Sequence, residues 1–270
     1  MPFATNKGIK IHYEIEGKGE PLILQHGNGG TLDSWHIFGY VNDLNKDHQL
    51  ILVDARAHGK SDRLYDNSAY TAETVAGDYA AILDDLGIKK AGYWGYSMGG
   101  RIGYKCMLRY NLSRMNYMIL GGSNPFGMRT EQDKKQNEES LSMLRMAIEK
   151  GMEAYVDFFE KRVGKMSPER KAQLLGTDPR ALLAFNSNSS TWPSSESLLP
   201  RLKLPCLIYA GEQDFGFAAA KEGAALIPGM PFVSFPGLNH MQCYAESNTV
   251  LPLVRKFLTG LKKRYISELN

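Results

Sequence analysis

The sequence contains little cysteine, and its cysteines are scattered. Three occur in 270 residues, at Cys106, Cys206 and Cys243. No two of them form a C-x-x-C arrangement, so the pattern gives little support for a metal site. The odd number, with two of the three inside apolar runs, argues against a disulfide framework. We therefore expect reduced thiols, no bound metal and a cytoplasmic protein.

Long apolar runs and a strong net charge are also missing. No stretch approaches the roughly 18 apolar residues of a membrane span, and the first residues lack the apolar core of a secretory signal. The sequence therefore predicts neither secretion nor a membrane span. Because 32 basic side chains nearly balance 29 acidic ones, nothing favours a nucleic-acid partner. A chain of this length that is 43% hydrophobic can form one large α/β domain or two ordinary domains.

The pattern around which the chain is organised is Gly95-Tyr96-Ser97-Met98-Gly99. An apolar and aromatic run precedes it, and a segment with helical periodicity follows. G-x-S-x-G between a strand and a helix is typical of a nucleophile elbow, whose sharp turn exposes the serine hydroxyl. The glycines remove side chains that would collide with this turn. An ordinary glycine-rich turn could have the same sequence, so catalysis by Ser97 also requires a base, an acid and an oxyanion site.

A second glycine-rich loop, residues 26–30, follows an apolar run at residues 21–25 that we interpret as a buried strand. In serine hydrolases of this layout, one oxyanion donor comes from such a loop and the other follows the nucleophile. The two donors would then be the backbone N–H groups of Asn28 and Met98. The alternative, a phosphate-binding loop, lacks a following Lys-Ser/Thr pair and a G-x-G-x-x-G pattern. We interpret His26 as a structural residue that orders the loop.

The order of the predicted elements favours an α/β fold. Residues 9–16 alternate apolar and polar side chains as an edge strand does, and strands then alternate with helices. This order predicts a mostly parallel sheet with helices on both faces. Residues 125–200 contain helical segments and no convincing strand. We expect them to form a helical cap inserted into a core of residues 1–124 and 201–270, the alternative being a helical appendage packed away from the active site.

Three side chains form a candidate catalytic triad. Ser97, Asp214 and His240 each come directly after a predicted strand. The carboxyl ends of parallel strands meet at one edge of a sheet, where α/β folds bind ligands. Their order along the chain is the one expected with a nucleophile elbow. His240 can accept the proton of Ser97, and Asp214 can fix the tautomer of His240.

Asp54 and His58 form a rival pair within one loop. They follow the apolar run at residues 49–53, so this loop also begins at a strand end. A polar, glycine-containing turn explains both residues without catalysis, and Asp54 can form a local ion pair with Arg56. We therefore assign the catalytic acid to Asp214 and keep Asp54 as its rival.

Over residues 8–265 the chain resembles the α/β-hydrolase superfamily. This resemblance implies an eight-stranded, mostly parallel sheet with a helical cap after the sixth strand, and a serine triad that works without a cofactor. Two positions depart from the common pattern: Tyr96 stands where histidine is frequent, and Ala57 replaces a frequent glycine. The motifs that carry the resemblance are His26-Gly27 with the glycines after it, Asp54-x-Arg56-x-His58-Gly59-x-Ser61, Gly95-Tyr96-Ser97-Met98-Gly99-Gly100, Gly211-Glu212-x-Asp214 and His240.

These observations predict a cofactor-free serine hydrolase that cleaves small-molecule carboxylic esters with small or medium acyl groups, through an acyl-enzyme. Among enzymes, the alternative is an enol-lactone or C–C bond hydrolase with the same triad. Outside enzymes, it is a ligand-sensing protein whose cap moves. Serine at position 97 disfavours the dehalogenases and epoxide hydrolases that use an aspartate nucleophile. We expect Trp192, Phe126 and Phe215 to line an acyl pocket, with packing between cap and sheet as the alternative role of Trp192.

Overall fold

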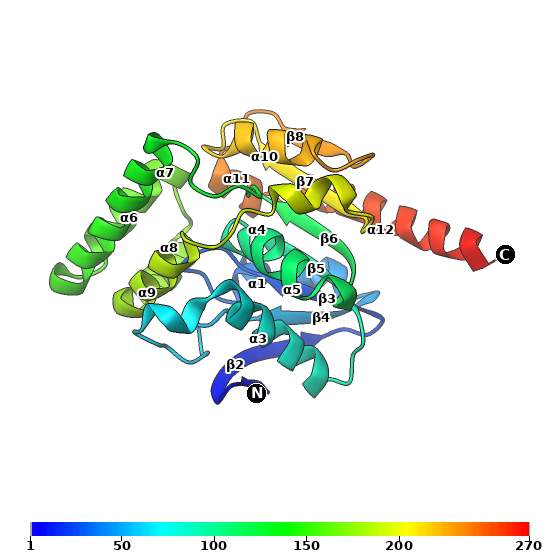
Figure 1. Cartoon of the computed structure of the whole chain (residues 1–270), viewed down its shortest axis with the longest axis horizontal. Helices are drawn as coiled ribbons and strands as arrows, with labels where there is room; N and C mark the ends of the chain where they lie inside the picture. The colour runs from blue at the N-terminus through cyan, green and yellow to red at the C-terminus, as the bar shows by residue number, and fades with distance from the viewer. Residues whose placement is uncertain (1, 270) are drawn as a thin grey trace.

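An eight-stranded sheet forms the centre of the computed structural model, which describes residues 2–269 and the side chains of residues 2–261. The strand order is β1-β2-β4-β3-β5-β6-β7-β8 (Figure 1). The β1–β2 and β2–β4 pairs are antiparallel and the remaining pairs are parallel, so the predicted α/β fold with a mostly parallel sheet is confirmed. The strands are β1 (Phe3–Asn6), β2 (Ile9–Glu16), β3 (Glu20–Gln25), β4 (His48–Val53), β5 (Ala91–Tyr96), β6 (Met115–Gly121), β7 (Cys206–Gly211) and β8 (Phe232–Phe235).

One predicted strand occupies a different place in the sheet. β2 coincides with the strand expected at residues 9–16, but it is not an edge strand, because β1 pairs with its outer side. Four residues pair in that outer ladder, from Phe3 opposite His12 to Asn6 opposite Ile9. The interpretation as an edge strand was therefore wrong, and the short strand before it forms the edge.

Helices cover both faces of the sheet (Figure 1). Successive strand residues point to opposite faces, so Ile23 and Leu24 belong to different hydrophobic cores. Among the described residues no helix is both long enough and apolar enough to cross a membrane. The helices outside the segment between β6 and β7 are α1 (Ser34–Ile37), α2 (Val41–Leu44), α3 (Ala72–Asp85), α4 (Met98–Ile102), α5 (Leu108–Tyr110), α10 (Phe217–Ala225), α11 (His240–Ala245) and α12 (Ser247–Leu269), with the 3-10 helices η1 (Asn67–Tyr70) and η3 (Leu112–Arg114) and the π-helix η2 (Gly103–Met107).

Four further helices lie between β6 and β7 and extend to one side of the sheet (Figure 1). The side chains of Thr130, Ser167 and Asp178 accept backbone N–H groups at the starts of three of them. The segment predicted as a cap thus contains these helices and, within the described residues, no strand. Its treatment as a separate domain, residues 125–200, stays a prediction. The helices are α6 (Glu131–Lys150), α7 (Glu153–Val163), α8 (Pro168–Leu175) and α9 (Pro179–Ser189), followed by η4 (Glu196–Arg201).

Candidate active site

Ser97 occupies a strained turn between β5 and α4. Its φ of 56° and ψ of −110° lie in a region that residues with a Cβ rarely adopt. The neighbouring glycines are required by close contacts. A Cβ at Gly95 would collide with the backbone of Gly99, and a Cβ at Gly99 would collide with the carbonyl group of Gln25. The strained turn that the G-x-S-x-G pattern predicts is therefore present, and Ser97 lines a cleft at the end of β5.

A chain of hydrogen bonds joins Ser97, His240 and Asp214. The Oγ of Ser97 lies 2.9 Å from Nε2 of His240, and Nδ1 of His240 lies 2.6 Å from Oδ2 of Asp214. The other carboxylate oxygen of Asp214 accepts the N–H of Gly216 at 2.7 Å. Because the buried carboxylate accepts from Nδ1–H, Nε2 of a neutral His240 is left to accept the serine proton. The structure thus brings the three predicted residues together in an arrangement capable of nucleophilic chemistry.

Tyr96 holds the backbone of the candidate base. Its hydroxyl donates a hydrogen bond to the carbonyl oxygen of His240 at 2.6 Å, and its ring stacks on that of Tyr244 at 4.3 Å. Burial raises the pKa of Tyr96 well above its usual value, so the hydroxyl remains a donor. The sequence showed Tyr96 only as a departure from a common pattern. Its contact joins residues 144 positions apart, which sequence spacing does not reveal.

The loop predicted to supply an oxyanion donor lies against the nucleophile. A Cβ at Gly27 would lie 3.5 Å from the Cβ of Ser97. Asn28 and Met98, the two residues whose N–H groups were predicted as donors, line the same cleft as Ser97. Their role as oxyanion donors stays a prediction.

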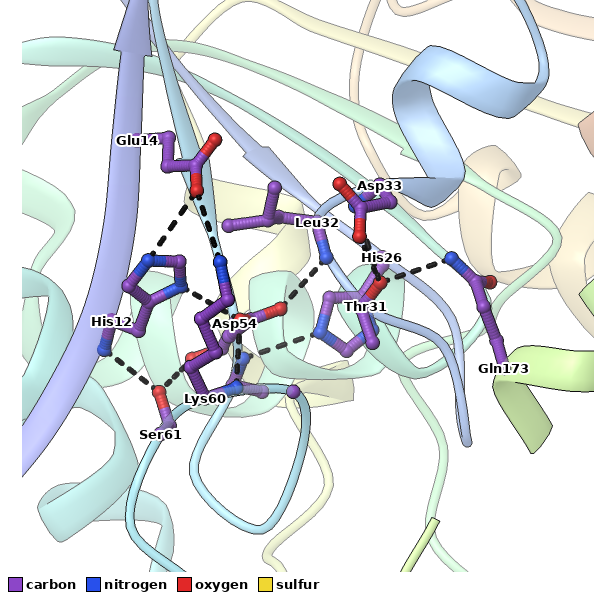
Figure 2. Close-up of polar contacts among 12 residues, drawn as sticks. His12, Glu14, His26, Thr31, Leu32, Asp33, Asp54, Lys60, Ser61 and Gln173 are labelled. Atoms are coloured by element: carbon purple, nitrogen blue, oxygen red, sulfur yellow. Dashed lines mark hydrogen bonds and ion pairs between the residues drawn. The ribbon is translucent and has the colours of Figure 1, made fainter. Parts of the chain in front are cut away.

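Buried polar contacts fix this loop to the segment that follows β4 (Figure 2). His26 Nε2 accepts the N–H of Ala55 at 3.2 Å. Asp54 accepts the N–H of Leu32 at 2.8 Å, and its other carboxylate oxygen lies 2.8 Å from Nδ1 of His12. Burial lowers the pKa of His26 well below its usual value, which keeps its ring neutral and able to accept. His26 therefore orders the loop, as the sequence predicted.

The expected local ion pair between Asp54 and Arg56 does not form, and that prediction was wrong. Arg56 instead makes a bidentate, buried pair with Asp78 of α3, with N–O distances of 2.7 and 2.5 Å. His58 Nε2 accepts the N–H of Gly29 at 3.1 Å, and burial lowers the pKa of His58 to about 4. The rival Asp54 and His58 thus have separate contacts within the scaffold that supports the loop.

Helix α8 covers the other side of the same loop. Arg170 donates to the carbonyl oxygens of Asn28 and Gly29, at 2.6 and 2.7 Å. Gln173, also on α8, donates to the hydroxyl of Thr31 at 2.9 Å (Figure 2). Burial lowers the pKa of Arg170 to about 10, so this side chain remains a cation at neutral pH. A helix of the segment between β6 and β7 therefore contacts the loop that carries a candidate oxyanion donor.

The cleft over Ser97 has a volume of about 330 Å³. Two of the three aromatic residues predicted for a pocket, Phe126 and Phe215, line it, and the Phe215 ring lies 4.9 Å from that of His240. Other aromatic side chains of the lining come from α7. The cleft therefore combines an apolar wall with the candidate nucleophile.

Trp192, the third predicted pocket residue, lies outside the described lining of this cleft. It is 3% exposed, and its indole N–H donates to the carbonyl oxygen of Tyr70 at 2.8 Å. Its ring lies 5.7 Å from that of Phe185. The assignment of Trp192 to the pocket is therefore corrected to packing, because its ring and its N–H group are both engaged in the core.

The three cysteines, Cys106, Cys206 and Cys243, are buried and unpaired. Burial raises the pKa of Cys206 and Cys243 to about 12, so both thiols stay protonated. Across the described part of the chain, no group of three or more histidine, cysteine, aspartate or glutamate side chains is placed to hold a metal ion.

Comparisons with known proteins identify the family and the fold of this chain. A family model described as "alpha/beta hydrolase fold" matches residues 20–200. A 2-hydroxy-6-oxononadienedioate/2-hydroxy-6-oxononatrienedioate hydrolase of Burkholderia vietnamiensis is 27% identical, over 83% of this chain and 81% of its own length. A thermophilic esterase from Thermogutta terrifontis has a TM-score of 0.83 at 22% identity, covering 96% of this chain and 98% of its own. An enol-lactonase from Burkholderia xenovorans has a TM-score of 0.80 at 22% identity, covering 96% and 100%. The two structures are similar to this chain in fold.

Proposed function

Because the chain belongs to the alpha/beta hydrolase family, we propose that it is a serine hydrolase that cleaves carboxylic esters of small or medium acyl groups. The observation that carries the proposal is the strained Ser97, with its Oγ 2.9 Å from a histidine whose other nitrogen bonds a buried carboxylate. A serine hydroxyl is a weak nucleophile unless a positioned base accepts its proton.

The reaction begins when Ser97 Oγ attacks the carbonyl carbon of the ester while His240 Nε2 accepts the hydroxyl proton. The carboxylate of Asp214 stabilises the resulting imidazolium. The N–H groups of Asn28 and Met98 donate to the oxyanion, and the C–O bond breaks as His240 returns the proton to the leaving alcohol. Water, deprotonated by His240, then attacks the acyl-enzyme. The resulting tetrahedral intermediate collapses and releases the acid, and His240 returns the proton to the Ser97 oxygen.

An enol-lactone or C–C bond hydrolase with the same triad is the second candidate. It is supported by the similarity of this chain to an enol-lactonase and to a hydrolase named for a hydroxy-oxo-dioate. A lactone is an internal ester, so the same attack by Ser97 would open its ring and the leaving alcohol would stay attached to the product. Parallel assays with a simple ester and an enol-lactone distinguish the two candidates.

Labelling with a fluorophosphonate tests the proposed nucleophile. The wild-type protein should gain one label on the peptide that contains Ser97, and Ser97→Ala should lose both the label and ester turnover, because a triad member carries several orders of magnitude in rate. Ser61→Ala is the matched control, since Ser61 lies in the other cluster of serine, histidine and aspartate, beside His12 and Asp54 (Figure 2). This variant should still be labelled at Ser97. Turnover by a folded Ser97→Ala protein within about tenfold of wild type would overturn the proposal.

A further inference from the structure

Three cationic side chains line the cleft over Ser97, namely Arg101 of α4, Lys105 of η2 and Arg162 of α7. Arg101 and Lys105 come four and eight residues after Ser97. At the rise of a helix they lie roughly 6 and 12 Å further along its axis. The backbones of Arg101 and Lys105 therefore lie about one and two helical turns beyond the nucleophile, and their side chains line the same cleft.

None of these three cations forms an ion pair with a carboxylate in the described part of the chain. Burial lowers the pKa of Arg162, and Glu139 offsets only part of this effect. The side chains of Arg101 and Lys105 form no hydrogen bond and no ion pair among the described residues, although the backbone N–H of Arg101 donates to the carbonyl oxygen of Ser97. Arg162 makes two long contacts with Gln136, at 3.4 and 3.3 Å, and lies 4.8 Å from the centre of the Phe215 ring. Lys105 is only 4% exposed. A buried charge without a partner is costly, so these side chains point to an anion that binds between them.

The contrast with other buried cations strengthens this reading. Arg56 is neutralised by Asp78, and Arg170 donates to two backbone carbonyl groups. The carboxylate that lines the described cleft belongs to Asp133, and its Oδ2 already accepts the backbone N–H groups of Arg129 and Thr130 at 2.9 and 2.8 Å. That carboxylate therefore caps the start of α6 and forms no ion pair with the cations of the cleft.

We propose that the substrate is an ester or lactone whose acyl part carries a carboxylate, which binds Arg101, Lys105 and Arg162. This inference rests on the proposed function and specifies its substrate class. A guanidinium presents a fork of donors that matches a carboxylate, and an ammonium adds a compact charge beside it. The remote carboxylate would hold the reacting carbonyl group over Ser97 while the aromatic wall contacts the carbon chain between them.

The test compares esters that carry an anionic, a neutral or a cationic terminal group. The probes are the mono-4-nitrophenyl esters of adipic and suberic acids, the same esters with a terminal primary amide, and 4-nitrophenyl 6-aminohexanoate as a cationic ester. Values of kcat/KM should be highest for the anionic ester, about tenfold or more above the amide, and lowest for the cationic ester, because charged hydrogen bonds discriminate by at least this factor. Equal rates for the acid and its amide would overturn the inference.

Substitutions show which residues discriminate between the anionic and the neutral ester. Lys105→Met and Arg101→Gln should each reduce the ratio of anionic to neutral kcat/KM by about tenfold, chiefly through KM, with much smaller effects on the amide. Arg109→Gln is the matched control, since Arg109 follows on α5 and donates to the Ser194 carbonyl group instead of lining the cleft. The control should keep the wild-type ratio of anionic to neutral kcat/KM. A decrease of this ratio in Arg109→Gln would contradict the assignment of the carboxylate site to Arg101, Lys105 and Arg162.

The two proposals fail in different ways. If Ser97→Ala abolishes turnover of every probe but wild-type protein prefers the amide, the triad stands and the carboxylate assignment falls. If the anionic ester is preferred and Ser97→Ala still turns it over, the cationic site stands and the nucleophile is wrong. Melting curves of each variant separate loss of binding from loss of folding.

Discussion

The guanidinium of Arg170 donates to the backbone carbonyl oxygen of Asn28 at 2.6 Å, across 142 positions of sequence. Its other terminal nitrogen donates to Gly29 at 2.7 Å, and the side chain is 2% exposed. Asn28 is also the residue whose N–H is a proposed oxyanion donor. Helix α8 therefore orients the loop that would stabilise the transition state, while Arg170 itself lies outside the described lining of the cleft.

Arg170→Met should lower kcat by roughly ten- to a hundredfold and change KM little, because two buried carbonyl groups lose their donor and the loop is free to shift. Arg170→Lys should recover part of the rate by restoring one donor. Steady-state kinetics on a neutral 4-nitrophenyl ester give this split between kcat and KM. Arg180→Met, at an exposed arginine of α9, is the matched control. An unchanged kcat in folded Arg170→Met protein would show that the hydrogen bonds of Arg170 have no role in positioning the loop.

Substitution of the two rival carboxylates, Asp214 and Asp54, should have different effects. Asp214→Asn should cost about 10⁴ in kcat with little change in folding, because the amide favours the wrong tautomer of His240. Asp54→Asn should instead lower the melting temperature, because Asp54 accepts the N–H groups of Leu32 and Lys60 and lies 2.8 Å from His12. Kinetics and melting curves on both variants decide between them. A folded but inactive Asp54→Asn protein, beside an active Asp214→Asn protein, would reverse the assignment of the acid.

Trp192→Ala should destabilise the protein without changing acyl preference. Removing a buried aromatic side chain costs roughly 3–5 kcal/mol in free energy of unfolding. The lost donor to Tyr70 adds to this cost. Denaturant unfolding and a panel of 4-nitrophenyl esters of increasing acyl length measure both effects. Trp192→Phe is the milder control, since it keeps an aromatic ring against Phe185. A changed ranking of acyl lengths at wild-type stability would return Trp192 to the pocket.

Much of the fold and the candidate triad followed from the sequence because their signals are local. A parallel sheet places every strand's carboxyl end at one edge, so Ser97, Asp214 and His240 could be brought together without knowing any side-chain contact. The strained turn was also predictable, since its glycines stand beside the serine. The outer strand at Phe3–Asn6 was missed because four residues carry too little alternation to be recognised.

The contacts that were missed join distant segments. Asp78 lies 22 positions beyond Arg56, and nothing in the spacing shows that the two form a pair. Arg101 and Lys105 stand at helical spacing after Ser97, a signal that could have been read as one face of a helix. That spacing alone does not distinguish a solvent face from a cleft. The structure makes this distinction, because Arg162 and other side chains of α7 line the same cleft as Arg101 and Lys105.

The last prediction concerns the pH dependence of selectivity for the anionic ester. Burial and the nearby Arg101 lower the pKa of Lys105 to about 8, while the Cys106 thiol opposes this shift. Arg162 is the other cation that lines the same cleft. Because kcat/KM reports on groups of the free enzyme, an anionic ester should lose its advantage as pH rises through about 8 and Lys105 loses its proton.

The ratio of kcat/KM for the anionic ester to that for its amide isolates this effect, because both substrates need the same form of His240 and that dependence cancels. In wild-type protein the ratio should be constant between about pH 6 and 7, where the terminal carboxylate of the ester stays ionised, and fall severalfold by about pH 10, to the residual preference provided by Arg101 and Arg162. Lys105→Met should show a smaller ratio that stays flat from about pH 6 to 10, since the two arginines remain charged. A wild-type ratio that does not change with pH, or one that falls equally in Lys105→Met, would mean that Lys105 does not bind the carboxylate.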